Sequence, residues 1–312
     1  MVSTRKMSMK LPWYLDFFIY YIQCLFFHRR NPILAGFKLT NRCNLNCLHC
    51  PFWKGSATPM LTFNQVEAIL SDLYRKGIRI LILEGGEPFL WKDGRYTIHD
   101  VVDRARSLFC SVGITTNGTF PLKINTNTVW VSIDGLRETH NRIRDNSFDK
   151  AMSNIQGSQH PNVYANITIN RINYEEIPEL VRFLAGKIQG ITIQFHYPYE
   201  KDDSLTLPFE ERRHVLDNLI ALKKKGYRIA NSYRCLEALK ENSWNCQDWM
   251  LANVEPDGTI NRGCYVRGRG DIQCAWCGFA AHTEISLAYR WHLQSILVGR
   301  RIFRYGKSPE YS

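Results

Sequence analysis

The sequence contains too few cysteines for a disulfide-stabilised scaffold, because only ten are spread over 312 residues. At least seven of them fall into groups with spacings typical of metal sites, which indicates a reducing compartment such as the cytosol. A chain of this length can bury the core of one large α/β domain and carry a smaller appendage.

A separate RNA-binding motif is also lacking, although the formal net charge is +11. Charge alone does not decide between nucleic acid, an anionic membrane and a basic host proteome. Because the sequence has no such motif, nucleic acid is the least favoured partner.

The most apolar stretch, residues 11–27, is 17 residues long, the lower limit for a helix that spans a membrane. No small-residue cleavage site follows it, which argues against a signal peptide. Basic residues flank both ends, and Asp16, Tyr20 and Gln23 form one polar stripe along a helix drawn here. We expect this helix to lie in a membrane interface or to pack on the protein.

From residue 31 onward, strand and helix signals alternate without a repeat or a low-complexity segment, which predicts a parallel sheet. Thr62 and Gln65 form a capping-box signature for a helix that runs to about Lys76, where Gly77 ends it. We predict helices near residues 98–108, 148–156 and 174–186. The predicted strands are 35–40, 78–83, 111–116, 129–133, 163–169 and 191–196. Six strands in this order fit a partial (β/α)6 TIM barrel, whose active site lies at the carboxyl ends of the strands.

Cys43, Cys47 and Cys50 place three thiolates within eight residues, directly after the first predicted strand. A [4Fe–4S] cluster is normally held by four cysteines, so three leave one iron open to a ligand that is not protein. Two alternatives remain: a zinc site completed by His49, or three cysteines that bind nothing.

The cysteine run resembles the CxxxCxxC signature of radical S-adenosylmethionine (radical SAM) enzymes. In that superfamily the amino and carboxylate groups of SAM chelate the fourth iron. Electron transfer from the cluster then cleaves SAM to a 5′-deoxyadenosyl radical. The resemblance implies a SAM-cleaving cluster on these three cysteines and an external electron donor such as ferredoxin or flavodoxin.

Three further segments, each at the end of a predicted strand, are similar to the GGEP, TNG and SxDG motifs of the same superfamily. There, a glycine pair lets the backbone approach SAM, an acidic residue meets its amino group, and short polar side chains line its ribose and carboxylate. A side chain at Gly86 should therefore weaken SAM binding and leave cluster assembly intact. An arginine downstream often meets the SAM carboxylate. The SAM-binding residues implied here are Gly85, Gly86, Glu87, Thr115, Asn117, Ser132, Asp134 and Arg144.

The later strands offer weaker candidates. Asn166, Thr168 and Asn170 alternate on one face of the fifth predicted strand, which in a barrel is either an inward functional face or a satisfied polar core. His196 ends the sixth strand and is a substrate-side candidate. No catalytic residue is assigned from the sequence.

A second cysteine group follows the predicted barrel and consists of Cys246, Cys264, Cys274 and Cys277. It is similar to the twitch and SPASM extensions of radical SAM enzymes, in which a glycine-bearing hairpin between two cysteines begins an auxiliary [4Fe–4S] site. The interval from Gly258 to the next cysteine is one residue longer than usual, and too few cysteines remain for two auxiliary clusters. We predict one auxiliary [4Fe–4S] cluster, with structural zinc as the alternative and Cys235 as a spare thiol.

The sequence thus predicts an α/β protein with a partial TIM barrel and a small C-terminal cysteine-rich domain. The predicted function is radical modification of an unidentified substrate, a lipid or polyprenoid or a peptide, and the alternative is a non-catalytic iron–sulfur or zinc protein. The protein is expected in the cytoplasm, in peripheral contact with the membrane. If both chain ends contact the membrane beside the barrel mouth, a lipid substrate can enter from the bilayer. The predicted segments are an apolar helix in 1–30, a radical SAM core in 31–205, a connecting helix in 206–234, the auxiliary-cluster domain in 235–285 and a basic amphipathic tail in 286–312.

Overall fold

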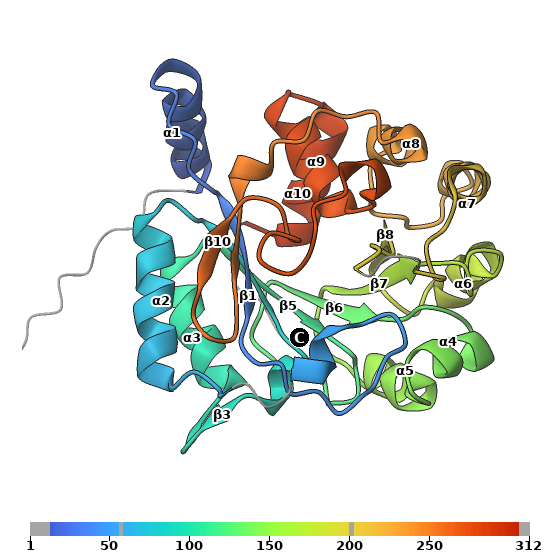
Figure 1. Ribbon diagram of the computed structural model, residues 1–312, viewed down its shortest axis with the longest axis horizontal. Coiled ribbons are helices and arrows are strands. Elements are labelled where there is room, and N and C mark those ends of the chain that lie inside the picture. The colour runs from blue at the N-terminus through green and yellow to red at the C-terminus, as the bar shows by residue number, and fades with distance from the viewer. Residues whose placement is uncertain (1–12, 56–58, 200–202, 306–312) are drawn as a thin grey trace, which may run out of the picture.

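The computed structural model describes residues 13–55, 59–199 and 203–305 and shows helices packed around a twisted sheet (Figure 1). Residues 1–12 and 306–312 of the predicted terminal segments lie outside the described part. The α-helices are α1 (Trp13–Phe26), α2 (Phe63–Arg75), α3 (Ile98–Leu108), α4 (Arg137–Ile143), α5 (Phe148–Gln156), α6 (Ile177–Leu184), α7 (Phe209–Lys224), α8 (Tyr233–Glu241), α9 (Ala280–Tyr289) and α10 (Leu293–Phe303). The strands are β1 (Leu34–Lys38), β2 (Ile80–Glu84), β3 (Lys92–Asp93), β4 (Tyr96–Thr97), β5 (Ser111–Thr116), β6 (Thr128–Ser132), β7 (Val163–Ile169), β8 (Gly190–Phe195), β9 (Leu251–Val254) and β10 (Ile260–Arg262).

The main sheet has eight strands in the order β10-β9-β1-β2-β5-β6-β7-β8, and the six from β1 to β8 are parallel. These six match the predicted strands to within two residues at each end, so the predicted partial barrel is confirmed. Strand β9 pairs in parallel with β1, and β10 pairs antiparallel with β9. The predicted C-terminal hairpin is therefore present, and it extends the barrel sheet.

Helix boundaries follow the local signals in the sequence. Thr62 caps α2: its hydroxyl accepts a hydrogen bond from the backbone N–H of Gln65, whose side chain accepts one from the N–H of Thr62. Gly77 ends the same helix with a φ of 102°, a left-handed conformation that favours glycine. Helix α6 begins at Ile177, three residues after the predicted start, because residues 173–176 form turns around Asn170.

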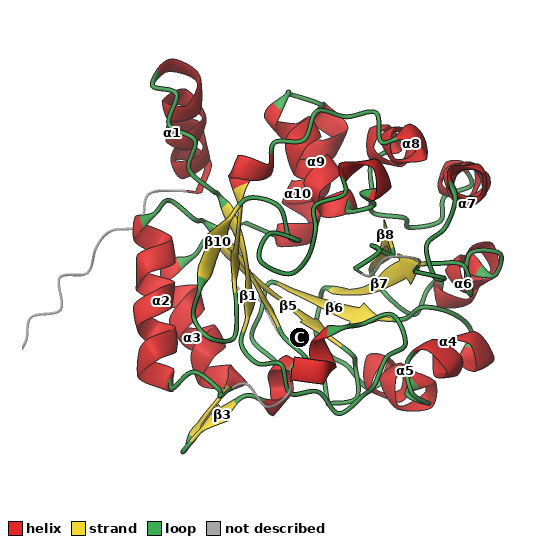
Figure 2. Ribbon diagram, viewed as in Figure 1, coloured by secondary structure: helices red, strands yellow, loops and turns green. Residues whose placement is uncertain are grey.

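The core lies between the strands and the helices that follow them (Figure 2). Every residue of β6 is buried, as expected for a parallel strand covered on both faces. Helices α2, α3, α5 and α6 place apolar residues against the sheet, among them Leu70, Val101, Ile155 and Leu180. Buried polar side chains lie at both ends of the strands, among them Thr128 at the start of β6 and Ser132 at its end.

Both described chain ends pack at the amino-terminal ends of the strands. Ser111, the first residue of β5, donates a hydrogen bond to the carbonyl of Phe303 (2.6 Å), and Thr128, the first residue of β6, donates one to the carbonyl of Ile302. Asp16 of α1 forms an ion pair with Arg79, directly before β2 (3.3 Å). The expectation that the chain ends lie beside the barrel mouth is therefore wrong, because these contacts hold them at the opposite end.

Candidate active site

The loop that follows β1 carries Cys43, Cys47 and Cys50, here called the loop cysteines. It lies at the carboxyl ends of the strands, where parallel barrels place their active sites. Cys47 is buried, the other two are half-buried, and the N–H of Cys50 bonds the carbonyl of Cys47 (3.2 Å).

Hydrogen-bond donors from three parts of the chain face the loop thiols. The N–H of Leu45 and the side-chain amide of Asn117 lie 3.4 and 3.9 Å from the sulfur of Cys43. The guanidinium of Arg144 lies 3.9 Å from the sulfur of Cys47. Burial nevertheless raises the pKa of Cys47 to about 11, with Arg144 acting in the opposite direction. Metal binding must therefore displace a proton from this thiol.

The glycine pair after β2 packs against the loop that leads to the cysteines. A Cβ built on Gly85 lies 2.6 Å from the carbonyl oxygen of Thr40, and one built on Gly86 lies 2.3 Å from that of Arg42. The N–H of Gly86 also bonds the carbonyl of Thr40 (2.6 Å). These glycines let two backbones meet, so a side chain at Gly86 would move the cysteine loop itself. The structure therefore gives a physical reason to expect that such a side chain disturbs cluster assembly as well, which differs from the outcome predicted from the sequence.

Glu87 is fully buried and binds the protein on both carboxylate oxygens. It accepts hydrogen bonds from the hydroxyl of Thr116 (2.8 Å), the N–H of Asn117 (2.8 Å) and the N–H of Phe89 (3.2 Å). Burial raises the pKa of Glu87 to about 7, and these three donors counteract that rise. The network joins the ends of β2 and β5, and a role of Glu87 toward SAM stays a prediction.

Asp134 and Arg144 form a buried ion pair after β6. Asp134 also accepts a hydrogen bond from the N–H of Thr168 (2.7 Å), and Arg144 lies 3.4 Å from Nε2 of His49. Burial and Arg144 hold the pKa of His49 well below its usual value, so its imidazole is neutral. Of the other predicted SAM-binding residues, Ser132 ends β6 and is buried, while Thr115 lies in β5 and is half-buried.

A second charged group, which was not among the predicted site residues, lies beside Cys50. Lys38, the last residue of β1, is buried with its Nζ 3.1 Å from the ring centroid of Phe52. Arg269, whose side chain is 2% exposed, pairs with Glu255 (2.7 Å) and lies 3.6 Å from Glu84. Burial and the nearby Arg269 lower the pKa of Lys38 to about 8. A lysine at the end of an apolar strand is a sequence signal that could have indicated Lys38 as a site residue. No local signal of this kind exists for Arg269.

A cleft of about 260 Å³ opens beside Cys50 and is lined by His49, His196, Tyr199 and Asp203, among others. Nε2 of His196 lies 2.7 Å from the carboxylate of Asp203, and the rings of the two histidines are 6.3 Å apart. The sequence marked His196 as a substrate-side candidate, and the structure places it in this cleft. Asp203, its partner, lies in a connection for which the sequence offered no pattern.

Cys246, Cys264, Cys274 and Cys277, here called the C-terminal cysteines, are gathered beyond the end of β8. Burial raises the pKa of Cys277 to about 12, and each of the other three thiols adds to that rise, so the four lie within electrostatic reach. Cys235 is buried elsewhere, with its sulfur 3.8 Å from the carbonyl of Ala280. It does not replace any of the four.

Across residues 13–55, 59–199 and 203–305, no three Cys, His, Asp or Glu side chains converge on the position of a single metal ion. In a cubane, each cysteine binds a different iron, so the sulfurs lie farther apart than ligands of one ion. Thiols in one loop, faced by N–H donors and a guanidinium, are a donor set that fits such a cluster.

Comparison with known proteins identifies the family. Residues 37–184, which run from β1 to the end of α6, match the family model of the radical SAM superfamily. These residues form a radical SAM domain. This match covers the loop cysteines and every residue predicted to bind SAM.

Two curated relatives and one solved structure extend the comparison. The Fe-coproporphyrin III synthase of Methanosarcina barkeri is 28% identical over 246 residues, covering 68% of this chain and 60% of the relative. The sporulation killing factor maturation protein SkfB of Bacillus subtilis is 29% identical over 202 residues, covering 58% of this chain and 47% of SkfB. This chain thus spans 60% of the first relative's length and 47% of the second's. The structure of Streptococcus suis SuiB bound to the precursor peptide SuiA has the same fold, with a TM-score of 0.62, 15% identity and coverage of 85% of this chain and 68% of SuiB.

Proposed function

We propose that this radical SAM protein is an enzyme that reductively cleaves SAM at a [4Fe–4S] cluster held by Cys43, Cys47 and Cys50. The bound cluster supplies the electron that generates a 5′-deoxyadenosyl radical for substrate modification. The observation that carries the proposal is the convergence of the cysteine loop, the 85–87 turn, Asn117 and Arg144 at the carboxyl ends of the strands.

The chain's own residues fix the shape of this site. Gly85 and Gly86 pack closely against the backbone that leads into the cysteine loop. Glu87 connects the ends of β2 and β5 through its hydrogen bonds. Asp134 holds Arg144 so that the guanidinium faces Cys47. A fixed positive charge beside a cluster favours its reduced, more negative state and raises its reduction potential. We propose the same influence for the buried Lys38 and Arg269 beside Cys50.

We further propose that the C-terminal cysteines hold one auxiliary [4Fe–4S] cluster. They are four thiols without a histidine, gathered next to Tyr197 at the end of β8. Arg269 and Tyr265 lie in the same connecting segment as Cys264, so this segment joins the ionic group around Lys38 to the C-terminal cysteines. A ferredoxin or flavodoxin is the proposed external electron donor.

For the substrate, we propose a peptide in preference to a lipid. The cleft beside Cys50 opens at the carboxyl ends of the strands, whereas the apolar chain ends lie at the other end of the barrel. A peptide is further supported by the relative named as a maturation protein and by the fold shared with a peptide-bound structure. His196 and Asp203 are the proposed substrate-side pair in this cleft.

The test is anaerobic reconstitution with iron and sulfide, followed by reduction with dithionite in the presence of SAM. We expect 5′-deoxyadenosine, detected by mass spectrometry, from the wild type and from Cys235→Ala, which removes a thiol outside both groups. The variant with Cys43, Cys47 and Cys50 all changed to alanine should form none. A wild-type protein that assembles its clusters and forms no 5′-deoxyadenosine would be a non-catalytic cluster carrier, and the proposal would fail.

A further inference from the structure

Helix α1 turns its polar side toward the protein and its apolar side outward, the reverse of an ordinary surface helix. Asp16 pairs with Arg79, the hydroxyl of Tyr20 donates to the carbonyl of Asn31 (2.6 Å), and Cys24 is buried. The polar stripe expected from the sequence is thus the contact surface. On the other side, Phe18 is 61% and Phe26 is 70% exposed, and the same side carries Leu15, Ile19 and Leu25.

The segment between α9 and α10 continues this surface. Tyr21 of α1 packs edge-on against Trp291 (4.7 Å between ring centroids), and the indole N–H of Trp291 donates to its hydroxyl. Trp291 itself is 61% exposed, and Leu293 and Leu297 of α10 are exposed beside it in the chain. We call Leu15, Phe18, Ile19, Leu25, Phe26, Phe27, Trp291, Leu293 and Leu297 the apolar end face.

The charges around the apolar end face are almost all positive. In residues 13–33 and 286–305 the only carboxylate is Asp16, which is paired with Arg79. The same ranges contain six arginines: Arg29, Arg30, Arg290, Arg300, Arg301 and Arg304. A bilayer with anionic headgroups matches both the apolar residues and the charges.

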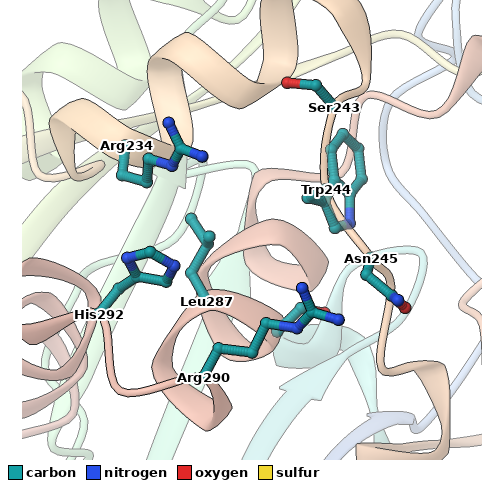
Figure 3. A pocket seen from close by; sticks show the side chains of 8 residues that line it. Arg234, Ser243, Trp244, Asn245, Leu287, Arg290 and His292 are labelled. Atoms are coloured by element: carbon teal, nitrogen blue, oxygen red, sulfur yellow. The ribbon is translucent and has the colours of Figure 1, made fainter.

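A small hollow beside Trp291 concentrates part of this positive charge. Arg234, Arg290 and His292 lie around Leu287 and enclose about 70 Å³ (Figure 3). Such a group of donors is suited to a phosphate oxygen. It adds a headgroup contact next to the exposed indole, a side chain favoured at the membrane interface.

We propose that the apolar end face docks on an anionic phospholipid bilayer, with α1 lying in the headgroup region. The described helix has 14 residues and a length of about 21 Å, short of the roughly 30 Å of a hydrocarbon core. None of the helices in the described part of the chain combines the length and apolar character that a bilayer crossing needs. Because the face lies at the amino-terminal ends of the strands, docking leaves the cleft beside Cys50 directed away from the membrane.

The test is flotation of the reconstituted full-length protein with liposomes of phosphatidylcholine alone or mixed with phosphatidylglycerol. We expect flotation only with the anionic liposomes, weakening as salt rises. The variant Phe18→Ser/Phe26→Ser should stay in the soluble fraction. Ile272→Ser, which changes an exposed apolar residue outside the face, should float like the wild type.

A second pair of variants, one next to the apolar end face and one elsewhere, tests the contribution of the arginine charges to liposome binding. Arg300→Gln/Arg301→Gln should lower partitioning roughly 30-fold at low salt, on the usual contribution of a basic residue near an anionic surface. Arg171→Gln/Arg182→Gln removes two exposed arginines outside the face and should have little effect. All variants should still produce 5′-deoxyadenosine, which shows that they fold and separates this test from that of the proposed function.

Two results would overturn the proposal. One is a wild type that remains soluble with anionic liposomes at low salt. The other is a concentration-dependent dimer, measured by light scattering, that Phe18→Ser/Phe26→Ser abolishes while flotation is absent. That dimer would assign the face to a second copy of the chain.

Discussion

The two cysteine groups differ in what holds them. The loop cysteines lie inside the barrel mouth, and Cys47 is buried and faced by Arg144, which is itself paired with Asp134. Among the C-terminal cysteines, Cys246 and Cys274 are exposed. Their segment is fixed mainly through backbone carbonyls, which accept hydrogen bonds from Asn242 of the α8 cap and Arg212 of α7.

This difference has a consequence for stability. The supports of the loop cysteines are buried ionic and carboxyl groups that belong to the strand ends, so removing one leaves a charge or a donor unsatisfied in the core. The supports of the C-terminal group are hydrogen bonds to backbone carbonyls, donated by the buried Arg212 and the half-buried Asn242, so losing a donor leaves a neutral carbonyl and no unpaired charge. Damage to the first group should therefore spread to the fold, and damage to the second should stay local.

The largest expected effect comes from removing each cysteine group in turn. With two cubanes assembled, iron and sulfide should each be about eight per chain, and either set of alanine substitutions should lower them to about four. Only the loss of Cys43, Cys47 and Cys50 should abolish SAM cleavage. Iron and sulfide assays with product analysis check this, and an unchanged iron content in the triple variant would contradict the assignment.

The ion pair between Asp134 and Arg144 should contribute more to stability than Arg212, which supports the segment of the C-terminal cysteines. Arg144→Met leaves Asp134 buried without its partner, at a cost of about 3 to 5 kcal/mol in the free energy of unfolding. Arg212→Met removes hydrogen bonds to the carbonyls of Trp276 and Cys277, at a cost of about 1 to 2 kcal/mol. Urea unfolding of both variants measures the difference, and equal losses would remove the distinction between the two groups.

The turn at Gly86 should be intolerant of any side chain. Gly86→Val forces a Cβ against the carbonyl of Arg42, so we expect a loss of about 3 kcal/mol in stability and of the iron bound by the loop cysteines. Gly157→Ala is the control, because a Cβ there lies 3.4 Å from its nearest neighbour. If Gly86→Val keeps its full iron content and loses only SAM affinity, the glycine faces the ligand as the sequence first suggested.

Glu87 should make the stability of the site around the loop cysteines depend on pH. Its pKa is raised to about 7 in the folded state, against 4.5 for an ordinary glutamate, so the folded protein holds this proton more tightly than the unfolded chain. That stabilisation is complete below about pH 4.5 and is lost as the pH rises to about 7, a change on the order of 3 kcal/mol. Unfolding of the metal-free protein at several pH values should show this slope, and Glu87→Gln should remove it. A slope that persists in the variant would assign it to another group.

The agreement between sequence and structure is closest where local signals are strong. The capping box at Thr62 and the alternation of apolar segments each predicted what the structure shows, and the loop cysteines follow the first strand as expected. The side-chain partners were harder to predict. The motifs predicted a role of Glu87 and Arg144 toward SAM, which stays a prediction. They did not indicate the protein partners that the structure shows, the N–H of Asn117 for Glu87 and the sulfur of Cys47 for Arg144.

Hydrophobic periodicity, helix capping and the spacing of cysteines act over a few residues, and so the sequence by itself determined the six parallel strands, the partial barrel and the radical SAM domain. The contacts of Arg269 with Glu84, of His196 with Asp203 and of α10 with the first residues of β5 and β6 join segments that are not adjacent in the chain. No local pattern encodes such pairs, because they form only when the closing sheet brings distant loops together. For the same reason, only the tertiary structure decided that the apolar chain ends lie opposite the barrel mouth, and that the polar side of α1 faces the protein.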